Sequence, residues 1–503
     1  MLYEKTQLGC LTTFAPELVF FLFKVGESLL EPSVRLYIYE SACAERLGTN
    51  ASACAHLARF ESWEMKVQED AAWDLLVYRI VLNVPAIALS LFCGAWSDKV
   101  GRKLPVMIAC LGTLVAVLSY MLSEAAGVRH FLPYVLVGAL IRGATGKAAM
   151  VTMALHSYVA DVSSPESRTE RLGRLLAMNF FGYFVGTLGV GTLLSVAGFN
   201  EVFSVVAVVY FLCVVVAMTC MRETVEPREG AAGSPFMPSN VSESVSVLTR
   251  KRSHGGRTHL LVLFATIVFH QACKSGEVDV TLLVVHRSPL DWTQSMYAYL
   301  LATDYACLGL AVLFLLPLII RVARPHDITL VLTGVVFKIF RLSLLALGPN
   351  TVTIFASVVI GCPSAMIISG VKSLVSKAVD EDEMGKTFSL LSCGETIANL
   401  VGGVALMTIY ATTLELFPGF AFTLEIVLFI GLFGVLLVVG QDMRAQWRDD
   451  LMADVTRTRT EYGATVALED SAAHARHAPE TDERKETEVG DVGTDKETLC
   501  KRD

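Results

Sequence analysis

Four charged residues stand at helical spacing inside an apolar segment near the start of the chain. Lys24, Glu27, Glu31 and Arg35 are separated by three, four and four residues, and the runs VFFLF and LYIY flank them. At about 100° per residue, these positions share one face of an α-helix. A charged side chain at the centre of a bilayer costs about 2.5–3.5 kcal/mol on insertion scales. This face must therefore meet partner charges, water or a charged ligand.

The two acids of this face lie one helical turn apart. Carboxylates at the spacing of Glu27 and Glu31 repel each other, which predicts that one of them holds a proton. The alternative is a ladder of ion pairs, in which Lys24 and Arg35 neutralise the acids and extend toward the membrane surface. The stripe is expected either to bind protons and a charged substrate or to balance charge within the protein.

Later segments carry comparable groups. His270, Lys274 and Glu277 share one helical face, which suits the handling of protons or substrate, although a membrane histidine is also common as a packing residue. Arg142 and Lys147 stand among small residues, and Lys147 has no acid in its own segment. An anionic substrate or an acid of the first charged segment is expected to face Lys147. Further candidates within apolar segments are Asp304, Lys338, Arg341, Glu395 and Glu425.

The segments that position these residues are predicted to cross a membrane. Of the 503 residues, 53% are hydrophobic and only 18% are charged, which is too apolar for an ordinary soluble protein. Runs of about 20 apolar residues predict an all-α membrane protein with twelve transmembrane helices. The predicted spans are 14–38, 74–97, 104–123, 131–155, 172–197, 200–221, 259–285, 297–320, 326–347, 351–372, 385–410 and 416–440.

Two long polar segments divide the chain. We predict an N-terminal six-helix half at 1–221, a cytosolic central loop at 222–258, a C-terminal six-helix half at 259–440 and a disordered cytosolic tail at 441–503. Lys and Arg are concentrated in the loops that follow every second span. By the positive-inside rule, these loops and both termini lie in the cytosol.

The first loop on the opposite side contains three residues that an oxidising compartment would modify. Asn50 begins the sequon Asn-Ala-Ser, which predicts glycosylation. Cys43 and Cys54 lie in the same loop and could form a disulfide with each other or remain free.

The segment GAWSDKVGRKLP follows the second span and begins at Gly94. We expect Asp98 to accept hydrogen bonds from the amides of a neighbouring helix N-terminus and to pair with Arg102. Gly94 permits close helix approach, and Gly101 permits a sharp turn. The segment resembles the signature of the major facilitator superfamily, Gly-x-x-x-Asp-x-x-Gly-Arg-Arg, with Lys103 in the last position. The resemblance implies two halves that rock, a latch at these residues, and a central cavity lined by the first and seventh spans.

Further segments are similar to solute carrier family 46, the group of the proton-coupled folate transporter and its endolysosomal relatives. The resemblance implies that His270 and Lys372 occupy functional positions, since the folate branch has a histidine and an arginine there. The segments that carry it are YVADVSSPESRTERLGRLL, SPLDW, SLVSKAVDEDEMGKTFSLL and YATTLELFPGFAFTL.

Three positions depart from the folate branch. Lys147 stands where that branch has an aspartate, and Leu176 stands near the position of its proton-coupling glutamate. Asp291 replaces the cysteine of the outer segment, so the disulfide from that loop to the first outer loop is not expected. These differences argue against folate transport by the coupling scheme of that branch.

The sequence predicts a secondary active transporter that works by alternating access and is coupled to protons. Its expected substrate is an organic anion or a small zwitterionic metabolite, such as a folate-like or peptidoglycan-fragment solute. The alternative is a membrane receptor or scaffold that signals through the tail. The sequence has no nucleotide-binding loop, catalytic grouping or metal-ligand spacing, so we expect neither an enzyme nor a cofactor beyond a proton gradient. The expected partners are a small molecule, protons and lipid, not nucleic acid, in the plasma membrane or an endolysosomal membrane.

Overall fold

Each predicted span coincides with one helix or with consecutive helical segments, and several helices run beyond the apolar stretch that predicts them. The computed structural model describes residues 14–47, 61–126, 131–224, 238–252, 255–286, 290, 292–347, 350–413 and 419–445. The first half contains α2 (Ala15–Leu47), α4 (Glu61–Val100), α5 (Lys103–Ala126), α6 (Phe131–Ala144), α7 (Lys147–Asp161), α8 (Arg168–Val196) and α9 (Phe199–Cys220). In this half, α6 and α7 together form the fourth span.

The second half begins with α11 (Gly256–His286). The eighth span consists of α12 (Gln294–Leu310), η4 (Ala311–Leu315) and α13 (Leu316–Ala323), and the ninth is α14 (Asp327–Leu347). The tenth span consists of α15 (Thr351–Gly361), η5 (Cys362–Ala365) and α16 (Met366–Lys377). The eleventh is α17 (Met384–Thr413), which follows the short η6 (Glu381–Glu383), and the last is the helix Phe420–Ala445.

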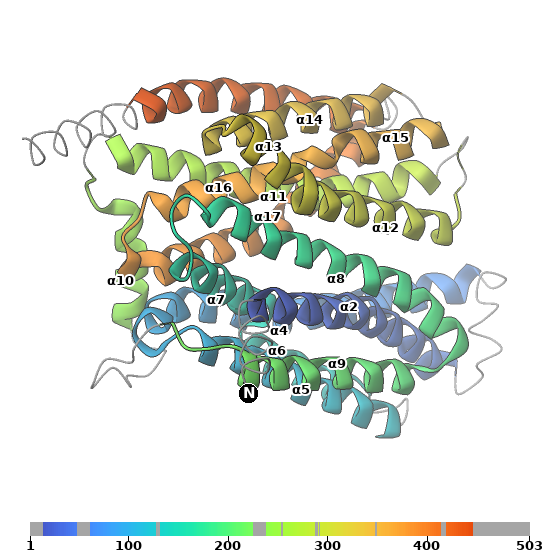
Figure 1. Ribbon diagram of the computed structural model, residues 1–503. Helices are drawn as coiled ribbons and strands as arrows, with labels where there is room; N and C mark the ends of the chain where they lie inside the picture. The colour runs from blue at the N-terminus through green and yellow to red at the C-terminus, as the bar shows by residue number, and fades with distance from the viewer. Residues whose placement is uncertain are drawn as a thin grey trace, which may run out of the picture. The chain divides into compact units, whose positions relative to one another are not determined.

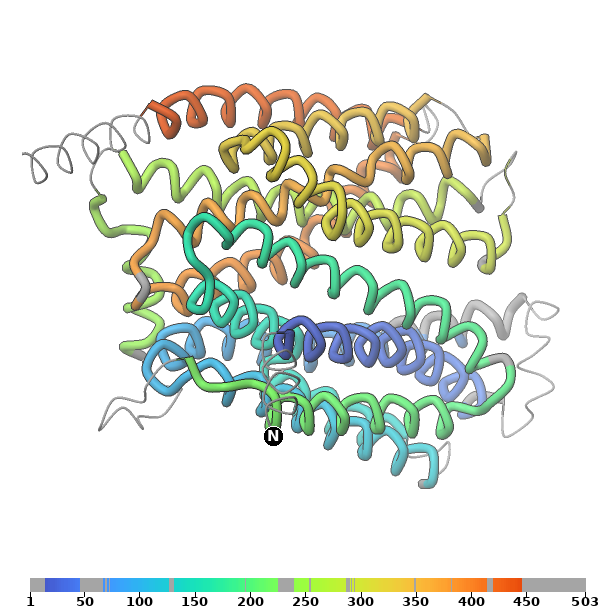
Figure 2. Tube along the Cα trace, in the orientation of Figure 1, coloured from blue at the N-terminus to red at the C-terminus, as the bar shows by residue number. Residues whose placement is uncertain are grey.

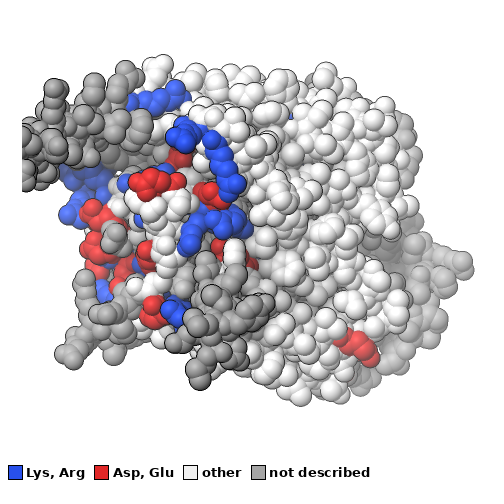
Figure 3. Space-filling view, in the orientation of Figure 1, with Lys and Arg blue, Asp and Glu red and all other residues white. Residues whose placement is uncertain are grey.

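The outer faces of the helices are apolar. On α5, the exposed side chains Leu111, Val115, Leu118 and Leu122 recur every three or four residues, as on one face of a helix. Such a surface is unfavourable in water and is suited to lipid. Figure 3 shows that the charged residues of the visible face gather at one end of the bundle, while the rest of that face is almost uncharged.

Ten helices of the described part of the chain are long and apolar enough to cross a membrane. The other two predicted spans are α2 and α11, whose charged and polar residues lower their hydropathy. The charged stripes recognised in the sequence therefore lie on the two long helices that are least suited to lipid contact.

The two groups of helices pack along a seam (Figures 1 and 2). From the first half, α4 and α7 pack against α17, while α8 packs against α12 and α16. The helix α2 packs on α8 and α9, and α11 packs on α17 and α16. The charged helices of the two halves are thus positioned by the same helices that build the seam.

Three spans depart from regular α-helix in mid-course. The fourth span breaks between α6 and α7, where Gly146 and Lys147 have positive φ angles of 83° and 49°. Span 8 contains the π-helix η4, and span 10 contains the 3₁₀ turn η5. Irregular backbone at membrane depth is tolerated where protein or a water-filled space surrounds it, and π-bulges are frequent at functional sites.

The central segment contains a helix that was not predicted. The sequence analysis assigned residues 222–258 to a loop, but α10 (Pro238–Thr249) lies across one end of the bundle, against α4, α11 and α17 (Figure 1). Its buried residues Asn240, Ser244 and Val247 are spaced by four and three residues, as on one helical face, and two of them are polar. The high serine content of the segment concealed this pattern.

Several predicted features lie outside the described residues: Asn50, Cys54, Asp291 and the tail beyond residue 445. Cys43 is buried and disulfide-bonded, and its partner is not among the described cysteines. Pairing of Cys43 with Cys54 therefore stays a prediction.

Candidate functional site

The charged stripe of α2 meets the broken fourth span. Glu31 lies 2.8 Å from Nη1 of Arg142 and 2.9 Å from Nζ of Lys147. Glu27 lies 2.8 Å from Nζ of Lys24 and 3.9 Å from Nη2 of Arg142. Lys24, Glu27 and Arg142 are all buried. Each acid of the stripe therefore faces cations of its own helix and of its neighbours.

These contacts overturn the prediction that repulsion leaves a proton on one acid of the stripe. Four cations, Arg35 included, contact Glu27 and Glu31, so attraction to them outweighs the repulsion between the two carboxylates. Arg35, whose side chain is 50% exposed, lies 3.8 Å from Glu31 at the outer end of the stripe. The arrangement is the ladder of ion pairs, extended by two cations of the fourth span.

The break in the fourth span explains how both of its cations reach one acid. In a continuous helix, Arg142 and Lys147 would point about 140° apart, because they are five residues apart. The left-handed residues Gly146 and Lys147 restart the helix in a new direction. For a non-glycine residue, this conformation costs about 1–2 kcal/mol. The ion pair of Lys147 with Glu31 helps to offset that cost.

A second charged cluster joins three helices of the other half. Glu277 of α11 forms an ion pair with Lys338 of α14 and lies 2.7 Å from Nε of Arg341. Arg341 also binds both carboxylate oxygens of Asp304 on α12, at 2.5 and 3.0 Å. The sequence identified each of these residues as an intramembrane charge but could not pair them.

Lys274 and His270 share the charged face of α11 but have different surroundings. Nζ of Lys274 lies 4.9 Å from the ring centroid of Phe180 on α8, so this cation reaches the first half. No carboxylate of the described residues forms an ion pair with it. His270 is buried, its Nδ1 has no hydrogen-bond partner among the described residues, and its ring meets Phe429 edge-on.

Aromatic residues link the α2 stripe to the second half. The ring of Tyr183 on α8 stacks on that of Tyr305 on α12, with centroids 5.2 Å apart. The hydroxyl of Tyr183 donates to Glu27 at 3.3 Å and accepts from Lys24 at 3.4 Å. A movement of α12 against α8 would therefore shift Tyr183 and change its hydrogen bonds to Glu27 and Lys24.

Lys372 is buried within α16, 3.0 Å from Glu395 of α17. The predicted end of the tenth span at residue 372 is too early, because the helix continues to Lys377 and Lys372 lies inside it. An ion pair between two helices of one half, rather than a helix terminus, stabilises this cation.

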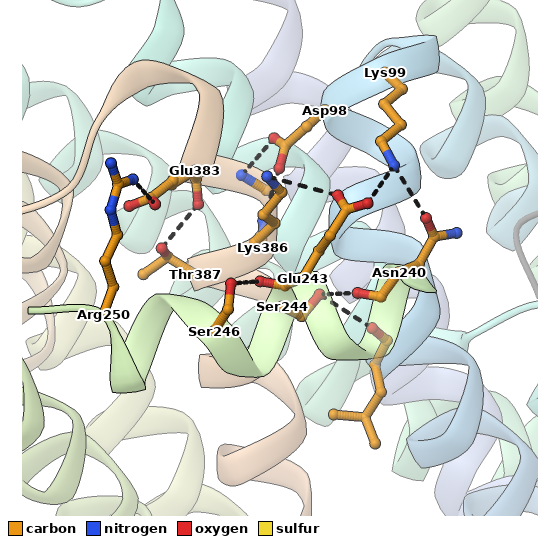
Figure 4. Close-up of polar contacts among 12 residues, drawn as sticks. Asp98, Lys99, Asn240, Glu243, Ser244, Ser246, Arg250, Glu383, Lys386 and Thr387 are labelled. Carbon is orange, nitrogen blue, oxygen red and sulfur yellow. Dashed lines mark hydrogen bonds and ion pairs between the residues drawn. The ribbon is translucent and has the colours of Figure 1, made fainter. Parts of the chain in front are cut away.

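The carboxylate of Asp98, at the end of α4, crosses between the halves. It accepts hydrogen bonds from the backbone amides of Gly385 and Lys386 at 2.7 and 3.0 Å, at the N-terminus of α17 (Figure 4). Nη1 of Arg102 lies 2.7 Å from Asp98, and its Nε lies 2.9 Å from Asp161. Both contacts expected of Asp98 are present in the structure.

The other residues of this segment have separate tasks. A Cβ atom on Gly94 would collide with α17, so this glycine permits the close crossing of the two helices. Gly101 has a φ of 116°, which only glycine adopts readily. Lys103 instead donates to the carbonyls of Met218 and Met221 at 2.7 and 3.0 Å and so caps α9 within the first half.

The same end of the bundle holds a related contact that the sequence analysis missed. Asp327, at the N-terminus of α14, accepts a hydrogen bond from Thr169 of α8 at 2.8 Å and lies 2.6 Å from Nζ of Lys377. Arg168 donates to the carbonyl of Ser376 at 2.9 Å. A comparison of the two halves could have indicated Asp327, since it lies between spans 8 and 9 as Asp98 lies between spans 2 and 3.

The helix α10 adds ion pairs to this end (Figure 4). Glu243 lies 3.0 Å from Nζ of Lys99 in the first half and 3.8 Å from Nζ of Lys386 in the second. Arg250 and Arg252 contact Glu383 at 2.8 and 2.6 Å. Thus α10 connects the two halves where Asp98 also joins them.

Residues 67–403, spanning most of the helices, match the family model of the Major Facilitator Superfamily. The chain belongs to this superfamily. It is 27% identical to the "Proton-coupled folate transporter" of Rattus norvegicus, over 69% of this chain and 75% of that one. It is 23% identical to the "Lysosomal proton-coupled steroid conjugate and bile acid symporter SLC46A3" of Gallus gallus, over 84% of this chain and 92% of that one.

A solved structure has the same fold. The human organic anion transporter MFSD10 (TETRAN) superposes with a TM-score of 0.64 at 15% identity, over 85% of this chain and 99% of that one. The predicted fold of twelve helices in two halves is confirmed, and these relatives bear out the resemblance to solute carrier family 46. The protein is a multi-pass membrane transporter. The described residues contain no group of three or more His, Cys, Asp or Glu side chains placed to hold a metal ion.

Proposed function

We propose that this transporter moves an organic anion together with protons, by alternating access between its two halves. The observation that carries the proposal is Lys274, a cation at the seam that has no carboxylate partner among the described residues. An anionic group of the substrate would complete its ion pairing. The ring of Phe180 beside it would pack against an apolar part of the same molecule.

The charge balance of the two clusters also favours an anion. With Lys274 added and the half-exposed Arg35 left aside, the two clusters hold six cations and four acids, so an anionic substrate would reduce an unbalanced positive charge. The cations are Lys24, Arg142, Lys147, Lys274, Lys338 and Arg341, and the acids are Glu27, Glu31, Glu277 and Asp304.

Two relatives support the details of the proposal by their names. Both are proton-coupled, and one is a symporter of steroid conjugates and bile acids. The buried His270, on the same helix as Lys274, supports proton coupling in this chain. Folate-like acids and acidic peptidoglycan fragments remain within the proposed substrate class.

The contacts of Gly94, Asp98 and Arg102 support a latch that is closed in this structure. We place this latch, α10 and both termini in the cytosol, because the basic loops lie at that end. Asn50 then faces the opposite compartment. The protein would reside in the plasma membrane or an endolysosomal membrane.

The test is uptake of radiolabelled organic anions into proteoliposomes that hold an inward proton gradient. We expect Lys274→Gln to raise the KM, since loss of a charged hydrogen bond costs about 1.5–3 kcal/mol, or roughly 10- to 150-fold. Lys274→Arg should retain part of the affinity. Lys251→Gln, in an exposed position at the end of α10, is the matched control.

Two results would reject the proposal. The first is a Lys274→Gln variant with the KM of the unmodified protein, which would remove Lys274 from the substrate site. The second is uptake that is the same at acidic and neutral outer pH and survives collapse of the gradient, which would remove proton coupling.

A further inference from the structure

One buried acid of the last helix has no hydrogen-bond partner. Glu425 has no exposed surface, and neither of its carboxylate oxygens meets a donor among the described residues. By contrast, Glu27, Glu31 and Glu277 each contact at least two cations. Glu17 also leaves one buried oxygen without a partner, but it lies in the first turn of α2, away from both clusters.

The surroundings of Glu425 contain several titratable groups. On α14, the cations Lys338 and Arg341 act on it electrostatically, and on α11 the acid Glu277 and the thiol of Cys273 do so. Phe429 lies one turn after Glu425 on the same helix, and its ring meets the ring of His270. Nζ of Lys338 lies 5.8 Å from the centroid of the Phe429 ring. Glu425 thus borders the second charged cluster without belonging to its ion pairs.

The neutral acid is the form of Glu425 that fits these contacts. An ionised carboxylate that is buried without a donor loses its hydration and gains nothing in exchange. Neither Lys338 nor Arg341 forms an ion pair with it, since both contact Glu277 instead. Glu277 is therefore the ionised acid in this state, and Glu425 is the acid that holds a proton.

We propose that Glu425 is the carrier of the coupled proton. This rests on the proposed proton coupling. On release, the O–H bond of Glu425 breaks, and the proton passes to water on the side to which the protein opens. Lys338 then moves from Glu277 to the new carboxylate, while Arg341 remains with Glu277. Arg341 is then shared by Glu277 and Asp304, so the second cluster with Glu425 carries one more negative charge than before release.

This exchange would link protonation to the substrate site. Glu277 and Lys274 lie on the same face of α11, so removal of Lys338 from Glu277 leaves that acid free to attract Lys274. Lys274 is the cation proposed to bind the substrate anion. Loss of the proton from Glu425 would thus weaken anion binding, which is the coupling that a symporter of anions and protons requires.

Two measurements test the assignment, and one of them needs no substrate. Infrared difference spectra of the purified protein, taken between acidic and alkaline pH, should contain the carbonyl band of a buried carboxylic acid. Glu425→Gln should remove this band. Asp442→Asn, an exposed position on the same helix, should leave it unchanged.

The second measurement compares two modes of transport. Because glutamine mimics the protonated acid, Glu425→Gln should keep exchange of internal for external anion while accumulation driven by a proton gradient falls at least tenfold. A carbonyl band that survives in Glu425→Gln, or gradient-driven accumulation that persists in this variant, would overturn the assignment. If the unmodified protein moves no anion, the proposed function fails, while the infrared band still decides whether Glu425 holds the proton.

Discussion

The carboxylate of Asp98 accepts a hydrogen bond from the backbone amide of Gly385 at 2.7 Å and so connects the end of α4 to the start of α17. The amide of Lys386 contacts its second oxygen. The N-terminus of a helix carries partial positive charge, so an ionised acid is held there by the helix itself and not only by a side chain. The two halves must break this contact to open at the α10 end.

Asp98→Asn should destabilise the closed end. The amide retains the shape of the side chain but loses its charge and the ion pair with Arg102. Charged hydrogen bonds contribute about 1.5–3 kcal/mol, so the population open at this end should rise roughly 10- to 150-fold. Pulsed electron paramagnetic resonance distances between spin labels on α5 and α14 would detect the change. Distances that match those of unmodified protein and of Asp442→Asn would contradict a latch at Asp98.

Glu31→Gln should destabilise the protein more than Glu27→Gln. Arg142 has no exposed surface, and Glu31 is its close partner, so this change leaves a buried cation largely unpaired. Breaking a buried ion pair costs about 3–5 kcal/mol. Glu27→Gln should destabilise the protein less, because the cation that it leaves without an acid, Lys24, has three aromatic rings within 6 Å of its Nζ, including those of Phe20 and Tyr183.

Thermal melting in detergent would rank the two variants. The double variant Glu31→Gln with Arg142→Met should recover part of the loss, because it removes the unpaired charge as well. Equal melting temperatures for the two single variants, or no recovery in the double variant, would show that the ion pair of Arg142 is not a main source of stability.

The sequence predicted the spans and the shared face of the α2 stripe because both follow from spacing within one segment. It predicted few of the contacts between helices; one was that of Lys147 with an acid of α2. Glu277 was grouped with Lys274, its neighbour in sequence, but its ion-pair partners are Lys338 and Arg341 of α14. The proton placed on Glu27 or Glu31 was wrong for the same reason, since the repulsion was considered within α2 alone.

Backbone irregularities were also beyond the sequence analysis. The positive φ of Lys147 is unusual for a lysine and arises from the break after α6. The contact of Asp98 with α17 could also be predicted, because a helix N-terminus accepts an acid whatever side chains it carries. That contact could therefore be predicted without knowledge of which residues begin α17.

Gly402→Ala should weaken the packing of α11 on α17. A Cβ atom at this position would collide with the backbone of Ala272, which cannot move aside as a flexible side chain can. Overpacking of this kind costs about 1–3 kcal/mol. Gly431→Ala is the matched control, since nothing lies within 4 Å of its Cβ position. Fluorescence-detected size-exclusion after heating should show a loss for Gly402→Ala alone, and equal losses would indicate a general effect of glycine replacement.

The clamp of α10 on Glu383 should withstand mild acid. Burial alone would raise the pKa of Glu383, but hydrogen bonds from Arg252 and Arg250 outweigh it and hold the pKa below its ordinary value of 4.5. Because the folded-state pKa is depressed, the stability that this acid adds is present above the ordinary value and is lost only as pH falls through the lower one.

Hydrogen exchange of the α10 amides would test this clamp. Once corrected for the intrinsic rate, protection of residues 238–249 should be the same at about pH 7 and about pH 5, since both lie above the pKa of Glu383. Glu383→Gln should lower the protection at both values, whereas Glu45→Gln, an exposed acid of α2, should not. Loss of protection in the unmodified protein at the lower pH would mean that α10 is released by acid, and that the pair of arginines does not control Glu383.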